Sequence, residues 1–205
     1  MKQSVFAFVM AATLFTTIGF IQPKAGYQVG DKVMNFNLKN VDGKTVSLDG
    51  NSSVKGYIVV FTCNTCPVAQ AYEDRIIALD KKYASEGYPV IAINANDAAL
   101  SSGDSFEEMK KRAARKSYGF AYLTDETQEV AKTYGARNTP TVFVVKRSGN
   151  DFILAYTGAI DNNTQDATSA TEKYVQNAVD ALLKDKTVSV PTTKAIGCGI
   201  KWKKA

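Results

Sequence analysis

Hydrophobic and polar positions change their spacing several times along the chain, and each change predicts a new element. Apolar and polar residues alternate at 34–38 and 45–48 on either side of the turn 41–44, which predicts a β-hairpin. The run 57–61 is apolar without interruption and rich in β-branched and aromatic residues, which is typical of a strand buried on both faces. A second run of this kind lies at 90–93.

Helical periodicity separates these strands. It is clearest from 67 to 86, where apolar residues recur every three or four positions and Gly87 supplies a stop. Capping-box patterns, in which a Ser is followed three residues later by Glu, mark two further starts. The helices expected from these signals span 67–86, 105–116 and 127–134, with a last helix that follows the capping box 169–172 and runs to about 182.

The second half of the chain adds three strands. A short strand is expected at 120–123, and 141–145 is expected to pair with 152–157 across the turn 148–150. The order is then β-hairpin, β-α-β, α-β-α, β-β, α. Strands that alternate with helices predict an α/β fold, with a mixed central β-sheet flanked by helices on both faces. One domain, over residues 28–190, accounts for all of these elements.

The first 25 residues carry a different pattern. Lys2 precedes a stretch from 5 to 21 without a charged residue, which is the layout of a secretory signal. The stretch is also just long enough to remain in a bilayer as an anchor. We therefore expect residues 1–25 to be a signal peptide or an N-terminal anchor, and the folded part to lie outside the cytoplasm.

Composition narrows the chemistry. The chain has 205 residues, of which 25 are basic and 20 acidic, for a formal net charge of +5. No stretch interleaves basic residues with stacking aromatic residues, so nucleic acid is not an expected partner. Histidine is absent, which removes the commonest general base and a common zinc or copper ligand. The three cysteines are too few for a disulfide scaffold, which leaves them a role in chemistry.

That chemistry centres on Cys63 and Cys66, which stand where the strand 57–61 gives way to the helix 67–86. The N–H groups of a first helical turn lack partners within the helix, and the helix dipole places partial positive charge there. A thiolate is stabilised at this place, so we expect a lowered pKa at Cys63. We interpret Cys63 as the exposed nucleophile and Cys66, on the same helical face, as the thiol that closes a disulfide with it.

Two other uses of a Cys-x-x-Cys pair remain open. A zinc site needs two further ligands, and the chain offers only Cys198 and carboxylates for them. A structural disulfide between Cys63 and Cys66 would close a very small loop and constrain little. The strand-to-helix position favours redox chemistry, and neither a metal nor a cofactor is expected.

Pro140 stands at the start of the predicted strand 141–145, directly after Thr139. Proline is permitted at the first residue of a strand, where its missing N–H interrupts no ladder. An X-Pro bond can be cis at modest cost. By itself, however, this segment indicates an ordinary start of a strand with a trans bond.

Cys198 is flanked by Gly197 and Gly199, which let the backbone turn or approach another surface closely. It is either a buried small side chain or a third redox residue, which reaches Cys63 or Cys66 or bonds another molecule. We expect residues 191–205 to form a C-terminal tail docked on the domain, with Trp202 as its anchor.

The cysteine pair after a buried strand, with Thr139 and Pro140 before the second hairpin, resembles the thioredoxin superfamily. More narrowly, residues 28–204 are similar to the bacterial redoxin group, which comprises thioredoxin-like and alkyl hydroperoxide reductase/thiol-specific antioxidant proteins. The segments that carry this likeness are 61–67, 134–140, 158–161 and 197–203. The resemblance implies a thioredoxin-like fold in which Pro140 is cis beside the cysteine pair. It also implies that the backbone of Thr139 offers hydrogen bonds to an extended substrate.

The resemblance further implies a thiol–disulfide oxidoreductase that reduces or exchanges disulfides in exported proteins. It would be periplasmic, or membrane-anchored and facing the periplasm, and would meet the membrane only through residues 1–25. Its partners would be a disulfide-bearing protein substrate and an upstream thiol reductant. A peroxiredoxin-like peroxidase is an alternative, but Val60 stands three residues before Cys63, where a hydroxyl is expected. A Sco-like metal-binding module is a second alternative, but that group uses a histidine ligand and this chain has no histidine.

Two positions depart from the family pattern. The group often has histidine between its cysteines where this chain has Thr65, so we expect a milder oxidant or a reductant. Thioredoxin carries a buried Asp on the strand before the pair, and the corresponding residue here is Tyr57. The proton acceptor for Cys66 is therefore open, with Asp97 and Glu73 as candidates.

Overall fold

The structure is a computed structural model that describes residues 26–204. The expected signal peptide or anchor, residues 1–25, lies outside the described residues. Within the described part, no helix has both the length and the apolar character needed to cross a membrane. The described part covers the expected domain, 28–190, and all but the last residue of the expected tail.

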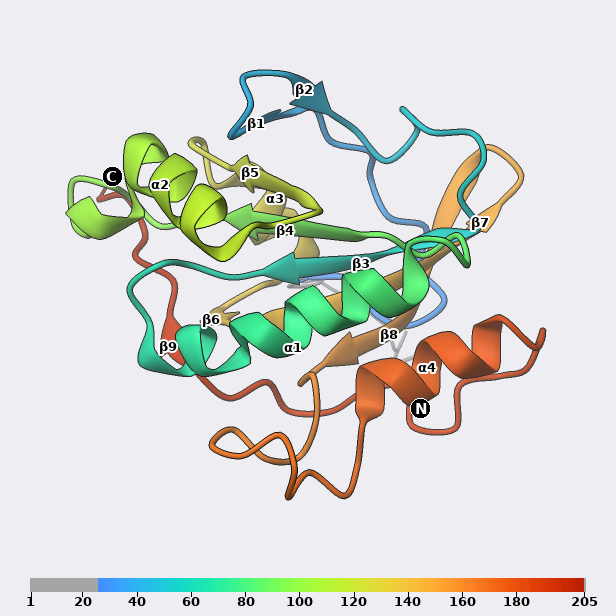
Figure 1. The fold of residues 1–205 in the computed structure, drawn as a ribbon. Coiled ribbons are helices and arrows are strands. Elements are labelled where there is room, and N and C mark those ends of the chain that lie inside the picture. Colours follow the sequence, from blue (N-terminus) through green and yellow to red (C-terminus); the bar gives the residue numbers. More distant parts are fainter. Residues whose placement is uncertain (1–25, 205) are drawn as a thin grey trace, which may run out of the picture.

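A mixed β-sheet forms the centre of the described part of the chain (Figure 1). Its strands lie in the order β2-β1-β5-β4-β3-β7-β8. β3 (Gly56–Phe61) pairs in parallel with β4 (Val90–Asn94) and antiparallel with β7 (Thr141–Ser148), and all six of its residues are buried. The other strands of the sheet are β1 (Leu38–Asn40), β2 (Thr45–Val46), β5 (Ala121–Thr124) and β8 (Asp151–Gly158). A separate pair is formed by β6 (Asn138–Thr139) and β9 (Cys198–Gly199).

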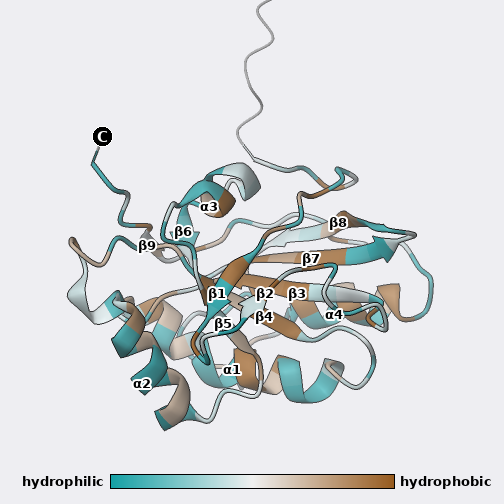
Figure 2. Ribbon diagram, turned by 90° about the horizontal axis from the view of Figure 1, so that it is seen from above, coloured by the Kyte–Doolittle hydropathy of each residue, from teal (hydrophilic) through white to brown (hydrophobic). Residues whose placement is uncertain are grey.

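Helices cover both faces of the sheet, as the order of elements predicts. α1 (Pro67–Tyr83), α2 (Phe106–Lys116) and α4 (Tyr174–Leu182) lie on one face, and α3 (Glu129–Tyr134) lies on the other (Figure 2). A 3-10 helix, η1 (Ser102–Asp104), precedes α2. The mixed sheet with helices on both sides confirms the predicted fold class.

The two faces of β3 build two separate cores, because successive side chains of a strand point to opposite faces. Ile58 and Val60 belong to the core that α1 and α4 cover. Val59 and Phe61 belong to the opposite core, where the ring of Phe61 lies 5.7 Å from that of Tyr134 between centroids. Packing on both sides fixes β3, and the residues that follow its C-terminal end start from a fixed position.

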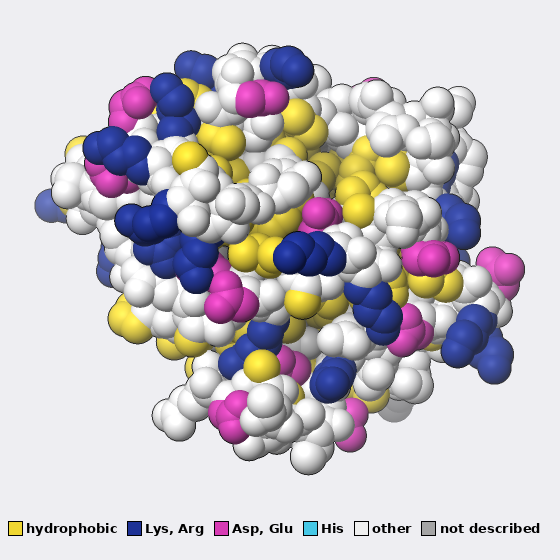
Figure 3. Space-filling model, in the orientation of Figure 1, with side chains coloured by type: hydrophobic (Ala, Val, Ile, Leu, Met, Phe, Trp, Pro, Cys, Tyr) yellow, Lys and Arg dark blue, Asp and Glu magenta, His cyan; other side chains and the backbone are white. Residues whose placement is uncertain are grey.

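The surface over α1, α2 and α4 carries mixed charge. Figure 3 shows Lys and Arg side chains interspersed with Asp and Glu over this face. Some of them form ion pairs within α2, such as Lys111 with Glu108 at 2.6 Å. Exposed pairs of this kind contribute little to stability, but they leave no large area of a single sign on this face.

The first expected strand, 34–38, is displaced toward the C-terminus. β1 begins only at Leu38 and pairs antiparallel with β2. Side chains hold the backbone of Met34 instead: its N–H donates to the Tyr27 hydroxyl at 2.8 Å, and its carbonyl accepts from the Tyr134 hydroxyl at 3.1 Å. Alternation does not distinguish a strand from an extended segment whose backbone bonds to side chains.

The last helix starts later than its capping box predicts. The hydroxyl of Ser169 donates to the Asp166 carboxylate at 2.5 Å and is not available as a cap. α4 begins directly after its N-cap residue, Lys173. The predicted box therefore belongs to the loop before the helix.

Other helix ends differ by a few residues, as is usual for boundaries taken from sequence. α1 ends at Tyr83 rather than at 86, because the chain turns before Gly87, whose φ is 95°. α3 begins at Glu129 rather than at 127. Ser105 is the N-cap of α2, as predicted, but its side chain makes no capping hydrogen bond.

Candidate active site

Cys63 and Cys66 lie in the short loop that joins β3 to α1. The N–H of Thr62 still bonds to the carbonyl of Ile93 in β4 at 2.9 Å, so the chain leaves the sheet just before Cys63. Cys66 is the N-cap of α1, and Pro67 is its first residue, where a missing N–H costs little. The pair therefore occupies the strand-to-helix junction that the sequence indicates.

Protein covers both sulfur atoms. Cys63 is 4% exposed and Cys66 is 2% exposed. They pack with Ala69 of α1 and with Cys198 of the tail. The interpretation of Cys63 as an exposed thiol is wrong for this arrangement, because the C-terminal segment of the same chain lies over the pair. All three cysteines are free thiols.

Thr139 contacts both members of the pair. Its hydroxyl oxygen lies 3.1 Å from Cys63 Sγ, and its carbonyl accepts a hydrogen bond from Cys66 Sγ at 3.4 Å. The peptide bond between Thr139 and Pro140 is cis, as the family resemblance implies and against the trans bond that the segment alone indicates. Two segments far apart in the sequence thus meet at the sulfurs.

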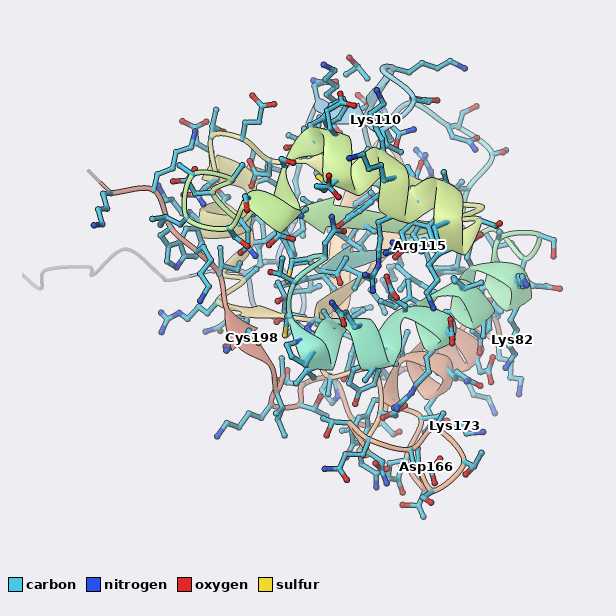
Figure 4. The ribbon with its side chains drawn as sticks, turned by 60° about the vertical axis from the view of Figure 1, so that its left-hand side comes forward. Lys82, Lys110, Arg115, Asp166, Lys173 and Cys198 are labelled. Atoms are coloured by element: carbon cyan, nitrogen blue, oxygen red, sulfur yellow. The ribbon has the colours of Figure 1, made fainter. Side chains whose placement is uncertain are left out.

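Cys198 lies at the same place. β9 pairs antiparallel with β6, which puts Cys198 opposite Thr139, and the N–H of Cys198 donates to Cys66 Sγ at 3.4 Å. Figure 1 shows β9 beside β6 and the start of α1, and Figure 4 shows Cys198 next to the first turn of α1. The structure therefore brings together every residue predicted for the site: Cys63, Cys66, Thr139, Pro140 and Cys198.

The pKa values of the three thiols shift in different directions. Burial raises the pKa of Cys63; the Thr139 hydroxyl opposes this rise and the Asp104 carboxylate adds to it. Burial also acts upward on Cys66, but hydrogen bonds from the Cys198 thiol and from backbone N–H groups outweigh it and lower the pKa. The hydrogen bond to Cys66 raises the pKa of Cys198 to about 11. The lowered pKa that we expected at Cys63 is found at Cys66.

A buried carboxylate that we did not predict from the sequence anchors the loop between the two cysteines. Asp104 is 3% exposed and accepts hydrogen bonds from the N–H of Asn64 at 2.6 Å and the hydroxyl of Thr65 at 2.7 Å. The side chains of Asn94 and Asn96 also donate to it. Because β3 and β4 are parallel, their C-terminal ends share one edge of the sheet, and a carboxylate after β4 reaches the loop after β3. The only signal in the sequence was an acidic residue in a Ser- and Gly-rich turn behind a buried strand.

Neither candidate proton acceptor lies at the sulfurs. Glu73 is bound by Arg112, with Nε 2.5 Å from Oε1, and by the hydroxyl of Tyr118 at 2.6 Å. Asp97 accepts a hydrogen bond from the N–H of Ala99 at 3.1 Å. Within residues 26–204, no hydrogen bond joins either carboxylate to a cysteine, so the structure supports neither assignment.

The arrangement offers sulfur chemistry. Three thiols gather in one place beside the hydroxyl of Thr139. Among the described residues, no group of three or more His, Cys, Asp or Glu side chains is placed to hold a metal ion. A cavity of about 270 Å³ opens next to Pro140, with Tyr72, Ile160 and Tyr174 in its lining. The site can therefore exchange disulfides, and it has room beside it for a side chain of a substrate.

Asp104 also makes stability depend on pH. Burial by itself would raise the pKa of Asp104, but hydrogen bonds from Ser101, Asn96 and Thr65 outweigh this and lower the pKa. Such a carboxylate stabilises the fold fully above its unfolded pKa of about 3.9, and this contribution is lost as the pH falls through the folded value. We expect the free energy of unfolding, from urea titrations between about pH 3 and pH 7, to decrease less steeply on acidification in Asp104→Asn than in the wild type.

Asp97→Asn is the matched control, because it removes one acidic charge from the same region without touching this network. It should show the pH profile of the wild type. Identical profiles for the wild type and Asp104→Asn would contradict the prediction.

Comparison with known proteins places this site in a family. The model of the AhpC/TSA family matches residues 29–150. The thiol-disulfide oxidoreductase ResA of Halalkalibacterium halodurans is 24% identical over 161 residues, which are 78% of this chain and 86% of that protein. The chain is therefore similar to a thiol-disulfide oxidoreductase over most of its length.

Solved structures show where the fold recurs. An uncharacterized conserved protein from Geobacillus kaustophilus has a TM-score of 0.80 and 36% identity, covering 87% of this chain and 94% of that one. The exposed lipoprotein thioredoxin Etrx1 of Streptococcus pneumoniae, with a TM-score of 0.54 and 20% identity over 74% of this chain and 99% of that one, shares the fold. Since the family model covers more than half of the chain, the chain belongs to the AhpC/TSA family, and its fold is thioredoxin-like.

Proposed function

We propose that the protein is a thiol–disulfide oxidoreductase that uses Cys63 and Cys66 to reduce or exchange disulfides in other proteins. The observation that carries this proposal is the contact of Thr139 with both sulfurs, at 3.1 Å to Cys63 and 3.4 Å to Cys66. It holds two free thiols side by side at the start of a helix. The similarity to a thiol-disulfide oxidoreductase over 78% of the chain supports the same activity.

The proposed reaction has two exchange steps. A substrate that displaces β9 uncovers Cys63 and so lessens the burial that raises its pKa. The thiolate of Cys63 then attacks a disulfide of the substrate, forms a mixed disulfide and releases one substrate thiolate. The thiolate of Cys66 then attacks Cys63 Sγ, which forms the Cys63–Cys66 disulfide and releases the second substrate thiolate. The lowered pKa of Cys66 suits this second role, because the thiolate is the form that attacks. An upstream thiol reductant returns the pair to two thiols.

An extended segment of a protein fits the surroundings of the pair. Thr139 lies in β6, whose edge is now paired with β9. A substrate that takes the place of β9 would find the same backbone groups of Thr139, and the cavity beside Pro140 would accept one of its side chains. Tyr72, Ile160 and Tyr174 make part of that cavity apolar, which favours an apolar side chain.

We further propose that the folded part works outside the cytoplasm, in the periplasm of a bacterium. The apolar stretch 5–21 behind Lys2 supports this location. The test is to express the full chain, separate the cell fractions, and measure the mass of the mature protein. Recovery of the intact chain in the cytoplasm would contradict the location without affecting the proposed reaction.

The activity itself is tested by comparing two substrates on one sample. Reduction of a disulfide-bonded model peptide, with dithiothreitol as the reductant, should be faster than consumption of hydrogen peroxide. The reduction potential of the protein should lie nearer that of thioredoxin, about −270 mV, than that of DsbA, about −120 mV. Rapid turnover of peroxide with slow reduction of the peptide would instead identify a peroxidase.

A further inference from the structure

Cys198 is more closely tied to the reacting sulfurs than a covering segment requires. Its N–H donates to Cys66 Sγ at 3.4 Å, and its side chain packs against Cys63 and Cys66. The chain thus places a third sulfur against the second one. Any small side chain would cover the pair, but only a cysteine can form a bond there.

The backbone around Cys198 is held in a fixed register. The N–H of Ile200 bonds to the carbonyl of Arg137 at 2.9 Å, and the side-chain amide of Asn138 donates to the carbonyl of Gly197 at 3.1 Å. A Cβ atom on Gly197 would collide with the carbonyl of Thr139. The close approach of this strand therefore depends on glycine at 197, and it fixes the position of the third thiol.

The three thiols also differ in their access to solvent. Cys63 and Cys66 are buried, whereas Cys198 is only half-buried. A small or protein thiol that approaches the closed site therefore meets Cys198 first. A disulfide that includes Cys198 would be open to a reductant that cannot reach the pair itself.

We propose that Cys198 is a third catalytic thiol, which takes over the disulfide from Cys63 at the sulfur of Cys66 after the substrate has left. This inference rests on the proposed function. The thiolate of Cys198 attacks Cys66 Sγ in the Cys63–Cys66 disulfide; the Cys66–Cys198 bond forms and Cys63 leaves as a thiolate, with no net oxidation. A dithiol reductant then attacks Cys198 Sγ, and its second thiol completes the reduction as the reductant itself becomes a disulfide.

The charges at the site favour this order of events. While Cys66 is a thiolate, its hydrogen bond to Cys198 raises the pKa of Cys198 to about 11. In the Cys63–Cys66 disulfide, the sulfur of Cys66 carries no charge, so this cause disappears. The charge of Lys201 acts in the opposite direction and favours the thiolate of Cys198. The third thiol is thus held protonated in the reduced protein and becomes easier to ionise once the pair is oxidised.

The first experiment maps disulfides in variants that keep two thiols each. Cys63→Ser and Cys66→Ser are oxidised in the native state with one equivalent of a mild oxidant, and unreduced peptides are identified by mass spectrometry. Cys63→Ser should close the Cys66–Cys198 disulfide within one chain, at least about tenfold faster than the same protein does in guanidinium, because the fold holds the two sulfurs together. Two free thiols, or only disulfides between chains, would overturn the proposal, as would equally fast closure in Cys66→Ser.

The second experiment moves the strand without touching a cysteine. Gly197→Ala in the Cys63→Ser background should slow closure of the Cys66–Cys198 bond about tenfold, because the strand can no longer approach Thr139. Gly199→Ala is the matched control, since an added Cβ there comes no nearer than 4.0 Å to the carbonyl of Arg137. Gly199→Ala should form the Cys66–Cys198 bond at the rate of the parent protein. Equal rates for both alanine variants would show that the close approach of Gly197 to Thr139 does not position Cys198.

Failure of this inference and failure of the proposed function are distinguishable. If the wild type reduces the model peptide while Cys63→Ser never forms the Cys66–Cys198 bond, only the third thiol is wrong. If the wild type does not reduce the peptide at all, the proposed function is wrong. In turnover with dithiothreitol, Cys198→Ser should accumulate the Cys63–Cys66 disulfide, and its absence at steady state would also overturn the inference.

Discussion

Replacing Cys63 by Ser should reduce peptide-disulfide turnover on the order of 10³-fold or more, because a hydroxyl at neutral pH does not supply the anionic nucleophile of the first step. Cys63 is buried, and the hydrogen bond of its side chain with the Thr139 hydroxyl is one that a serine can also make. The fold should therefore survive the change. The measurement is the rate of reduction of the model peptide, with circular dichroism and urea unfolding to verify the fold.

Cys66→Ser is the informative partner of this variant. It keeps the attacking thiol but lacks the one that resolves the mixed disulfide, so a stable adduct between Cys63 and the substrate should accumulate. The adduct is visible on a non-reducing gel and by mass. If Cys63→Ser retained wild-type turnover, or if the adduct formed on another cysteine, the order of the two steps would be wrong.

Asp104→Ala should have the second large effect, a loss of about 3 kcal/mol in the free energy of unfolding. The change leaves the buried N–H of Asn64 without its acceptor and takes from the amide of Asn94 the nearer of its two acceptors, the other being the Tyr122 hydroxyl. An unsatisfied buried donor costs about 1–3 kcal/mol. The loop between the cysteines also loses its anchor at Thr65. Urea unfolding at neutral pH measures the loss in the free energy of unfolding. The rate of alkylation of the thiols measures how far the loop between the cysteines is loosened.

Asp97→Ala is the control for this prediction, because its carboxylate accepts one hydrogen bond in a half-buried turn. Asp97→Ala should lose much less free energy of unfolding than Asp104→Ala. A loss of less than about 1 kcal/mol in Asp104→Ala would show that water replaces the carboxylate, and that the loop does not depend on it.

The parts of the fold that the sequence predicted are those where one pattern allows one structure. An unbroken apolar run such as 57–61 can only be a strand buried on both faces here, and the structure buries all six residues of β3. The helix after it, with Pro67 at its start, follows from the same local rules. The prediction was wrong where one pattern fits two structures. The alternation at 34–38 fits an extended chain held by two tyrosines as well as it fits a strand.

The residues of the site could be predicted from the sequence, but their burial and their pKa shifts could not. Cys63 and Cys66 could be found from their position at the end of a strand, and Pro140 from the family resemblance. Their burial could not, because it depends on a strand that comes 132 residues after Cys66. The direction of each pKa shift follows from that burial and from the hydrogen bond of Cys198. Asp104 was missed for a similar reason, since its role comes from the parallel pairing of β3 with β4.

The late position of β9 in the chain has a consequence for biosynthesis. A protein chain is synthesised from its N-terminus to its C-terminus, so the cysteine pair is made long before the strand that covers it. Any chain interrupted before residue 197 would keep the backbone of β6 unpaired and both sulfurs uncovered. Nascent or truncated molecules should therefore react most readily with oxidants or with other thiols, whereas a chain that includes β9 covers its own cysteine pair.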